Sequence, residues 1–168
     1  MSSIQLETLS QNLEILKLKI PPEEMATFMI DEEYTCEQID AVEKLFDHFS
    51  RKQQETTVQF LLKCSRLPMK NPRTFDNFNF SELSGKGVEK LKSIRTLNPL
   101  YAHKNLAFIG PAGTGKTHLA MAFAHECCCK MMKAYFIKMS ELNDMFTEAR
   151  KYGRENSVIN AMVTPSCI

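Results

Sequence analysis

GPAGTGKT, residues 110–117, fills every fixed position of the P-loop pattern G-x-x-x-x-G-K-[ST], which is also called a Walker A motif. The apolar run Leu106 to Ile109 precedes it, and a helix-forming stretch begins at Thr117. Glycines permit a tight loop whose backbone N–H groups converge on phosphate oxygens, and the positive end of the following helix dipole adds to the attraction. A strand, a glycine-rich loop and a helix in this order predict a binding site for a nucleoside triphosphate.

The residue types at the end of this motif predict which group contacts which part of the nucleotide. Lys116 is expected to reach the β- and γ-phosphates, and Thr117 is expected to offer its hydroxyl to Mg²⁺. Magnesium prefers oxygen ligands and takes most of them from water and substrate, so ATP and Mg²⁺ are the expected ligands. The predicted nucleotide-binding residues are Gly110, Pro111, Ala112, Gly113, Thr114, Gly115, Lys116, Thr117 and His118.

Segments on both sides of the motif predict a parallel α/β sheet. Residues 105–109 and 134–139 have the composition of strands, and residues 116–130 are expected to form the helix between them. Ser140 is the expected N-cap of a further helix, which stops at Gly153. Strands that alternate with helices in this way favour a parallel sheet covered by helices.

The first third of the chain has a purely helical pattern. Leucine and isoleucine recur mostly every three or four positions over residues 4–16, and a short second helix is expected from Glu23. Thr35 and Gln38 have the spacing of a capping box. The apolar stripe that follows predicts either one long helix or two packed helices over residues 36–66.

Residues 68–86 differ in composition from both flanking regions and are predicted to be a linker. The linker would join a helical N-terminal domain, residues 1–67, to part of a P-loop domain, residues 87–168. Its phenylalanines either stack on a nucleotide base or anchor the linker to the next domain. They are Phe75, Phe78 and Phe80.

Charge is distributed unevenly along the chain, although the formal net charge is only +1. Residues 1–50 carry eleven acidic and three basic side chains, whereas residues 51–103 carry ten basic and four acidic ones. This basic middle segment predicts either a surface that attracts nucleic-acid phosphate or a solvated face, and charge alone leaves both open. Its basic residues are Arg51, Lys52, Lys63, Arg66, Lys70, Arg73, Lys86, Lys90, Lys92 and Arg95.

Composition predicts an ordinary globular core, since 43% of the 168 residues are hydrophobic. No apolar run approaches the ~20 residues of a membrane span, and residues 1–4 lack a targeting pattern, so a cytoplasmic protein with no membrane partner is expected. The six cysteines lack zinc-ligand spacing and are expected to be reduced thiols. His118 and His125 lie two helical turns apart, which is too far to share a metal ion without other ligands.

Residues 110–120, GPAGTGKTHLA, resemble the phosphate loop of the IstB-like ATP-binding proteins, which are related to the DnaC helicase loaders in the AAA+ class. Residues 66–68 and 74–80 are similar to the family's linker between a helical N-terminal domain and an ATPase domain. Residues 140–142 stand where the family begins its next helix. The resemblance covers nearly the whole chain, and the phosphate loop is its specific part.

This resemblance implies an α/β fold in which a helical N-terminal domain precedes the N-terminal part of an AAA+ type parallel-sheet ATPase domain. It implies an ATP-binding helper of insertion-sequence transposition that oligomerises on DNA and acts with a transposase. A DnaC-type helicase loader, with a replicative helicase as its partner, is the alternative. A non-catalytic remnant that acts only as an interaction module is a third possibility.

AAA+ catalysis also needs an acidic Walker B pair, a polar sensor and an arginine from a neighbouring subunit, and the sequence contains no recognisable candidate for any of them. The chain stops close to where the family's Walker B carboxylates are expected, so it is interpreted as truncated. We therefore assign no catalytic residue and expect ATP binding without hydrolysis. The P-loop strand also lacks the two strands that flank it in the AAA+ order, which predicts exposed sheet edges.

Overall fold

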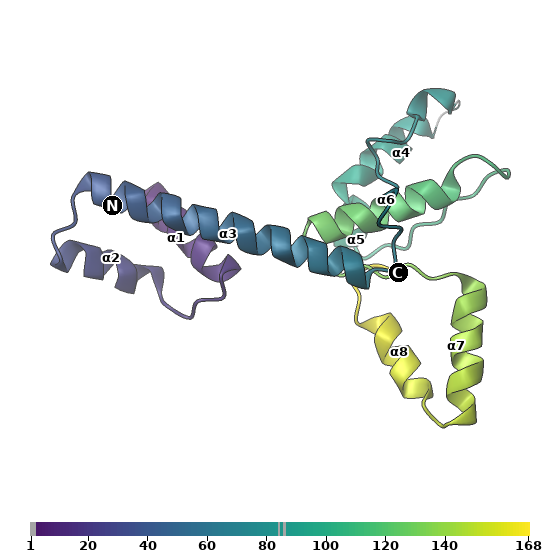
Figure 1. The fold of residues 1–168 in the computed structure, drawn as a ribbon. Helices are drawn as coiled ribbons and strands as arrows, with labels where there is room; N and C mark the ends of the chain where they lie inside the picture. The colour runs from purple at the N-terminus through teal and green to yellow at the C-terminus, as the bar shows by residue number, and fades with distance from the viewer. Residues whose placement is uncertain (1–2, 84, 86) are drawn as a thin grey trace. The chain divides into compact units, whose positions relative to one another are not determined.

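The computed structural model describes residues 3–83, 85 and 87–168, with side chains from residue 6 onward. Met1, Ser2, Lys86 of the basic middle segment and the side chain of Ile4 therefore lie outside the described residues. The chain divides into two compact units, Met1–Thr57 and Val58–Ile168. Helices provide the regular structure of both units (Figure 1). None of the described helices is long and apolar enough to cross a membrane.

The first unit contains α1 (Ser3–Ile15), α2 (Pro22–Asp31) and most of α3 (Cys36–Cys64). Proline near the start of α2 fits the helix because the first N–H groups have no intrahelical partner. Leucines of α1 and a methionine of α2 form a small core, against which one apolar stripe of α3 packs. The residues involved are Leu9, Leu13, Met29, Ile39, Val42 and Phe46.

Polar contacts fix the register of α1 against α3. The side-chain amide of Asn12 donates to Asp47 Oδ1 at 2.8 Å, and the buried Ser50 hydroxyl donates to the Asn12 carbonyl at 3.3 Å. The predicted capping box is confirmed, since Thr35 N donates to Gln38 Oε1 at 2.8 Å and Gln38 N donates to Thr35 Oγ1 at 3.3 Å. Residues 36–64 form one long helix rather than two.

The second unit is built around α6 (Lys116–Cys129), which is buried on several sides. The end of α3, the linker phenylalanines and the short helices before the P-loop contribute the rest of this core. The remaining elements are η1 (Phe80–Glu82), α4 (Val88–Ser93), η2 (Ile94–Thr96), α5 (Asn98–Tyr101), α7 (Met139–Lys151) and α8 (Glu155–Val163). The helices α7 and α8 pack against each other (Figure 1).

The predicted parallel sheet is wrong, because the described residues contain no β-strand. Residues 105–109 have no regular structure, and no backbone hydrogen bond joins them to another described segment. The second predicted strand forms an isolated parallel bridge between Ala134 and Cys167, and Phe136 N donates to the Ser65 carbonyl at 2.8 Å. In that bridge Tyr135 N donates to the Cys167 carbonyl at 2.9 Å.

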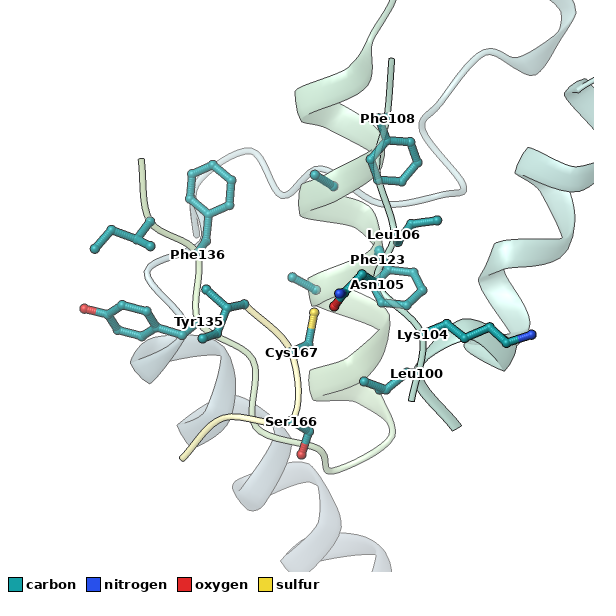
Figure 2. Close-up of a pocket in the computed structure, with 14 residues that line it drawn as sticks. Leu100, Lys104, Asn105, Leu106, Phe108, Phe123, Tyr135, Phe136, Ser166 and Cys167 are labelled. Atoms are coloured by element: carbon teal, nitrogen blue, oxygen red, sulfur yellow. The ribbon is translucent and has the colours of Figure 1, made fainter. Parts of the chain in front are cut away.

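A cavity of 330 Å³ lies between the two segments. Figure 2 shows Leu106 and Phe108 on one side of it and Tyr135 and Phe136 on the other. A strand requires a neighbour that pairs its N–H and C=O groups. The N–H groups of Tyr135 and Phe136 donate to other segments, and those of residues 105–109 donate to no described acceptor. The apolar residues that predicted strands line this cavity instead.

The predicted ends of α7 are half correct. Lys138, not Ser140, is the N-cap, and it makes no side-chain capping bond. Glu141 in the first turn lies 3.6 Å from Arg66 and 3.9 Å from Lys138, so a carboxylate near the positive end of the helix dipole stabilises this start instead. The predicted stop is confirmed, because α7 ends at Lys151 and Gly153 follows with φ of 62°.

Thiol reactivity tests the packing of α6. Cys127 and Cys128 are fully buried, whereas Cys36 and Cys64 are exposed. A hydrogen bond with Cys167 raises the pKa of Cys127, and burial adds to this increase. Burial also raises the pKa of Cys128. Since the thiolate is the reactive form, alkylation of the folded chain near pH 7 should reach the exposed thiols on the order of a hundredfold faster.

Peptide mass spectrometry over a time course of iodoacetamide treatment measures these rates. Urea should remove the difference, because it exposes all the thiols equally. Equal rates in the folded chain would contradict the buried position of α6.

Candidate nucleotide-binding site

The glycine spacing of the motif has a conformational basis. Gly113 and Gly115 have φ of 80° and 79°, in the left-handed region that glycine adopts without a Cβ penalty. The loop therefore turns back on itself before α6 begins. The helix starts at Lys116, with Gly115 as its N-cap.

Position 115 also requires glycine because the Phe78 ring leaves no space for a side chain there. A Cβ added to Gly115 would lie 2.5 Å from Cε2 of the Phe78 ring and 3.1 Å from its Cζ. A Cβ on Gly113 would meet no atom within 4 Å. The linker thus contacts the phosphate loop at the residue that caps α6.

Backbone amides at the start of α6 are free to bind an anion. The first helical bond runs from Leu119 N to the Gly115 carbonyl at 3.0 Å, and the N–H groups of residues 116–118 donate to no described acceptor. Gly115 offers no side chain to cap them. These donors and the positive end of the helix dipole favour a phosphate at this position.

Lys116 and Thr114 both bond to the loop itself. The Lys116 ammonium donates to the Pro111 carbonyl at 2.5 Å, and the Thr114 hydroxyl donates to the same oxygen at 2.9 Å. A phosphate bound at this loop would give the Lys116 ammonium a charged acceptor in place of the neutral Pro111 carbonyl. Such charge-assisted bonds are roughly twice as strong as neutral ones.

Thr117 is the predicted magnesium ligand, and its position fits that role. It is exposed in the first turn of α6, and its hydroxyl makes no hydrogen bond with the described part of the chain. The described residues contain no cluster of three or more His, Cys, Asp or Glu side chains that would hold a metal ion alone. A single exposed hydroxyl could supply one oxygen ligand to a magnesium ion whose other ligands are phosphate and water oxygens.

A cavity of 380 Å³ adjoins the phosphate loop. The loop forms one side of it through residues 113–115, and the linker forms another side through residues 77–79 together with Glu82 and Leu83. His118 also lines it. The linker phenylalanines anchor this wall, since Phe75 is buried and Phe78 and Phe80 pack against the core.

Both histidines of α6 have defined partners. Nε2 of His118 lies 2.9 Å from the Thr74 carbonyl and 2.9 Å from Asn77 Oδ1, so its ring faces the linker. His125 Nδ1 lies 3.5 Å from Cys129 Sγ. The two rings therefore face different neighbours, His118 the linker and His125 the end of α6.

The basic middle segment is partly neutralised by ion pairs. Arg66 pairs with Glu141 at 3.6 Å, Arg95 pairs with Asp76 at 2.7 Å, and Lys92 pairs with Glu89 at 2.8 Å. Arg51 and Lys52 pair with carboxylates of α3 at 3.6 Å. The basic residues of the segment with no ion pair among the described residues are Lys63, Lys70, Arg73 and Lys90.

Comparison with known proteins agrees with this geometry. The family model described as "IstB-like ATP binding protein" matches residues 10–168. The chain belongs to the IstB-like ATP-binding family. A putative ATP-binding protein of insertion sequence IS5376 from Geobacillus stearothermophilus is 29% identical over 117 residues, which are 70% of this chain and 46% of that protein.

Two further relatives of this IstB-like chain carry similar names. The IS232 putative ATP-binding protein of Bacillus thuringiensis subsp. berliner is 26% identical over 90% of this chain and 60% of its own length. An IS21-like putative ATP-binding protein of Bacteroides fragilis (strain YCH46) is 28% identical over 56% of each chain. The IstB-like chain thus spans about half the length of the curated relatives that it matches.

The polar wall of the cavity was not predicted as part of the IstB-like site. Thr74 and Asn77 bond reciprocally, with Thr74 N donating to Asn77 Oδ1 at 2.9 Å and Asn77 N donating to Thr74 Oγ1 at 3.4 Å. The spacing T-x-x-N is the same as that of a capping box, which would have indicated an ordered turn in the linker.

Proposed function

We propose that this chain is the ATP-binding component of a DNA transposition system and binds Mg·ATP through residues 110–118. The observation that carries the proposal is the phosphate loop itself. Two left-handed glycines, free amides at the start of α6 and the Lys116 ammonium all belong to one short loop. The insertion-sequence names of the relatives support the transposition role.

Each part of the nucleotide has a matching part of the site. The β- and γ-phosphates accept from the α6 amides and from Lys116, and Thr117 contributes one oxygen to phosphate-bound Mg²⁺. The nucleoside occupies the 380 Å³ cavity beside the loop. Calorimetric titration of the chain with Mg·ATP tests this proposal, and an absence of binding heat at high protein concentration would contradict it.

The DnaC-type alternative uses the same loop, so the partner distinguishes the two functions. A transposition helper should bind a transposase and its DNA, whereas a helicase loader should bind a replicative helicase. Pull-down of the purified chain with each purified candidate partner, in the presence of ATP, decides between them. Retention of the helicase alone would overturn the transposition role.

DNA binding is proposed to use the unpaired basic residues of the middle segment. Lys63→Glu with Lys70→Glu should lower affinity for duplex DNA about tenfold at low salt and reduce the slope of log affinity against log salt by up to ~0.9 for each lost phosphate contact. Fluorescence anisotropy at several salt concentrations measures both quantities. Arg51→Glu with Lys52→Glu is the control, because these two cations are already paired within α3. An equal loss of DNA affinity in the two double variants would contradict the proposal that the unpaired basic residues bind DNA.

A further inference from the structure

We infer that His118 is a positioning residue, which holds the linker segment Thr74–Phe80 against the phosphate loop so that this segment forms a wall for the nucleoside. The inference rests on the proposed function for its ligand, a nucleoside triphosphate. It assigns to His118 a role other than direct phosphate contact. The bond from α6 to the linker is the feature that carries it.

The direction of this bond is fixed by its surroundings. Asn77 Nδ2 donates to the Pro72 carbonyl at 2.7 Å, while Asn77 Oδ1 accepts from Thr74 N at 2.9 Å, so the orientation of the amide is determined. Both atoms that face His118 Nε2 are therefore acceptors, namely Oδ1 and the Thr74 carbonyl. Nε2 must carry a hydrogen and donate to them.

The linker segment is ordered by hydrogen bonds within itself. Thr74 and Asn77 close one turn. Asn79 closes the next, accepting from Ser81 N at 3.2 Å and donating to Glu82 Oε1 at 2.7 Å. The bond from His118 therefore acts on an ordered wall, together with the core packing of Phe75 and Phe80.

Phe78 transmits this position to the phosphate loop. Its ring lies 5.1 Å from the His118 ring and 4.8 Å from the Phe80 ring, edge to face in both cases. The same ring covers Gly115. Phe78 thus lies next to both the His118 ring and the Gly115 backbone. Without the His118 contact, we expect the Phe78 ring to move and open the cavity on the nucleoside side, while the phosphate-binding amides stay in place.

Two matched substitutions test the inference. His118→Ala removes the donor, whereas His118→Gln keeps a donor amide at a similar reach. His125→Ala is the control, because His125 lies on the same helix and faces Cys129 rather than the linker. Calorimetry measures affinities for Mg·ATP and for inorganic tripolyphosphate, and hydrogen exchange without nucleotide measures the protection of residues 74–83.

His118→Ala is expected to weaken ATP binding about tenfold, to leave tripolyphosphate binding unchanged and to raise exchange in the linker. His118→Gln should restore most of the ATP affinity, and His125→Ala should behave as wild type. Wild-type ATP affinity in His118→Ala, or an equal loss for tripolyphosphate, would overturn the positioning role. Failure of the proposed function is distinguishable, since the wild-type chain would then bind neither ATP nor tripolyphosphate.

Discussion

Gly115→Ala is expected to lower the melting temperature by about 7 °C, compared with about 4 °C for Gly113→Ala. Both glycines have nearly the same left-handed φ, so the new Cβ costs about 1–2 kcal/mol of backbone strain at either position. Only at Gly115 does the Cβ also meet Phe78, at 2.5 Å. If the ring is displaced, it loses aromatic contacts with Phe80 and His118 that stabilise the fold by about 1 kcal/mol.

A double variant isolates the contact with Phe78. Gly115→Ala should cost less stability in a Phe78→Ala background than in the wild type, because the clash is absent there while the backbone strain remains. Thermal unfolding followed by circular dichroism measures the melting temperatures of the wild type, the single variants and the double variant. Equal melting temperatures for Gly115→Ala and Gly113→Ala would show that the linker does not lie on the phosphate loop.

Lys116→Ala is expected to lower the affinity for Mg·ATP about a hundredfold or more, on the order of 3 kcal/mol. The ammonium is the one cation that the motif places against the β- and γ-phosphates. In the structure its partner is a carbonyl of its own loop, so its removal should cost the fold less than about 1 kcal/mol. A large loss of affinity should therefore accompany a small change in melting temperature.

Lys130→Ala is the control for Lys116→Ala. Lys130 is the C-cap residue of the same helix. Lys130→Ala therefore tests whether the loss of any positive charge at α6 lowers the affinity for ATP, or only the loss of Lys116. Calorimetric titration of both variants and the wild type gives the comparison. Equal ATP affinity in the wild type and Lys116→Ala would exclude the P-loop as the binding site.

Local sequence patterns predicted the helices well because their signals are local. The capping box at Thr35 and Gln38, the apolar stripe of α3 and the glycine after α7 each act within a few residues, and the structure contains all of them. The phosphate loop was likewise predictable, since glycine positions and the following helix depend on the motif alone. The helix α8 was missed, although Val158, Ile159 and Met162 have helical spacing.

The strands were predicted wrongly because a strand depends on its neighbours. Residues 105–109 have suitable composition, but apolar side chains alone do not show which segment will pair with them. In the structure this run and residues 135–137 line a shared cavity. The backbone that lies beside a segment depends on the rest of the fold, so the sequence of the segment alone cannot show whether it will pair as a strand.

Contacts between distant segments account for the parts of the candidate site that sequence could not give. Phe78 and Gly115 are far apart in the chain, as are His118 and Asn77, and no spacing rule connects them. His118 was predicted to bind nucleotide because it follows the motif directly. Its bond to the linker became visible only once both segments were placed.

Amide resonances of the phosphate loop test the central claim most directly. In a ¹⁵N-labelled chain, addition of Mg·ATP should shift the resonances of Gly113, Gly115, Lys116 and Thr117 more than those of the rest of the chain, because phosphate oxygens accept from N–H groups that have no acceptor in the described part of the chain. The same addition to Lys116→Ala should leave them nearly in place. A saturating titration of the wild-type chain that does not move these four resonances would contradict the account.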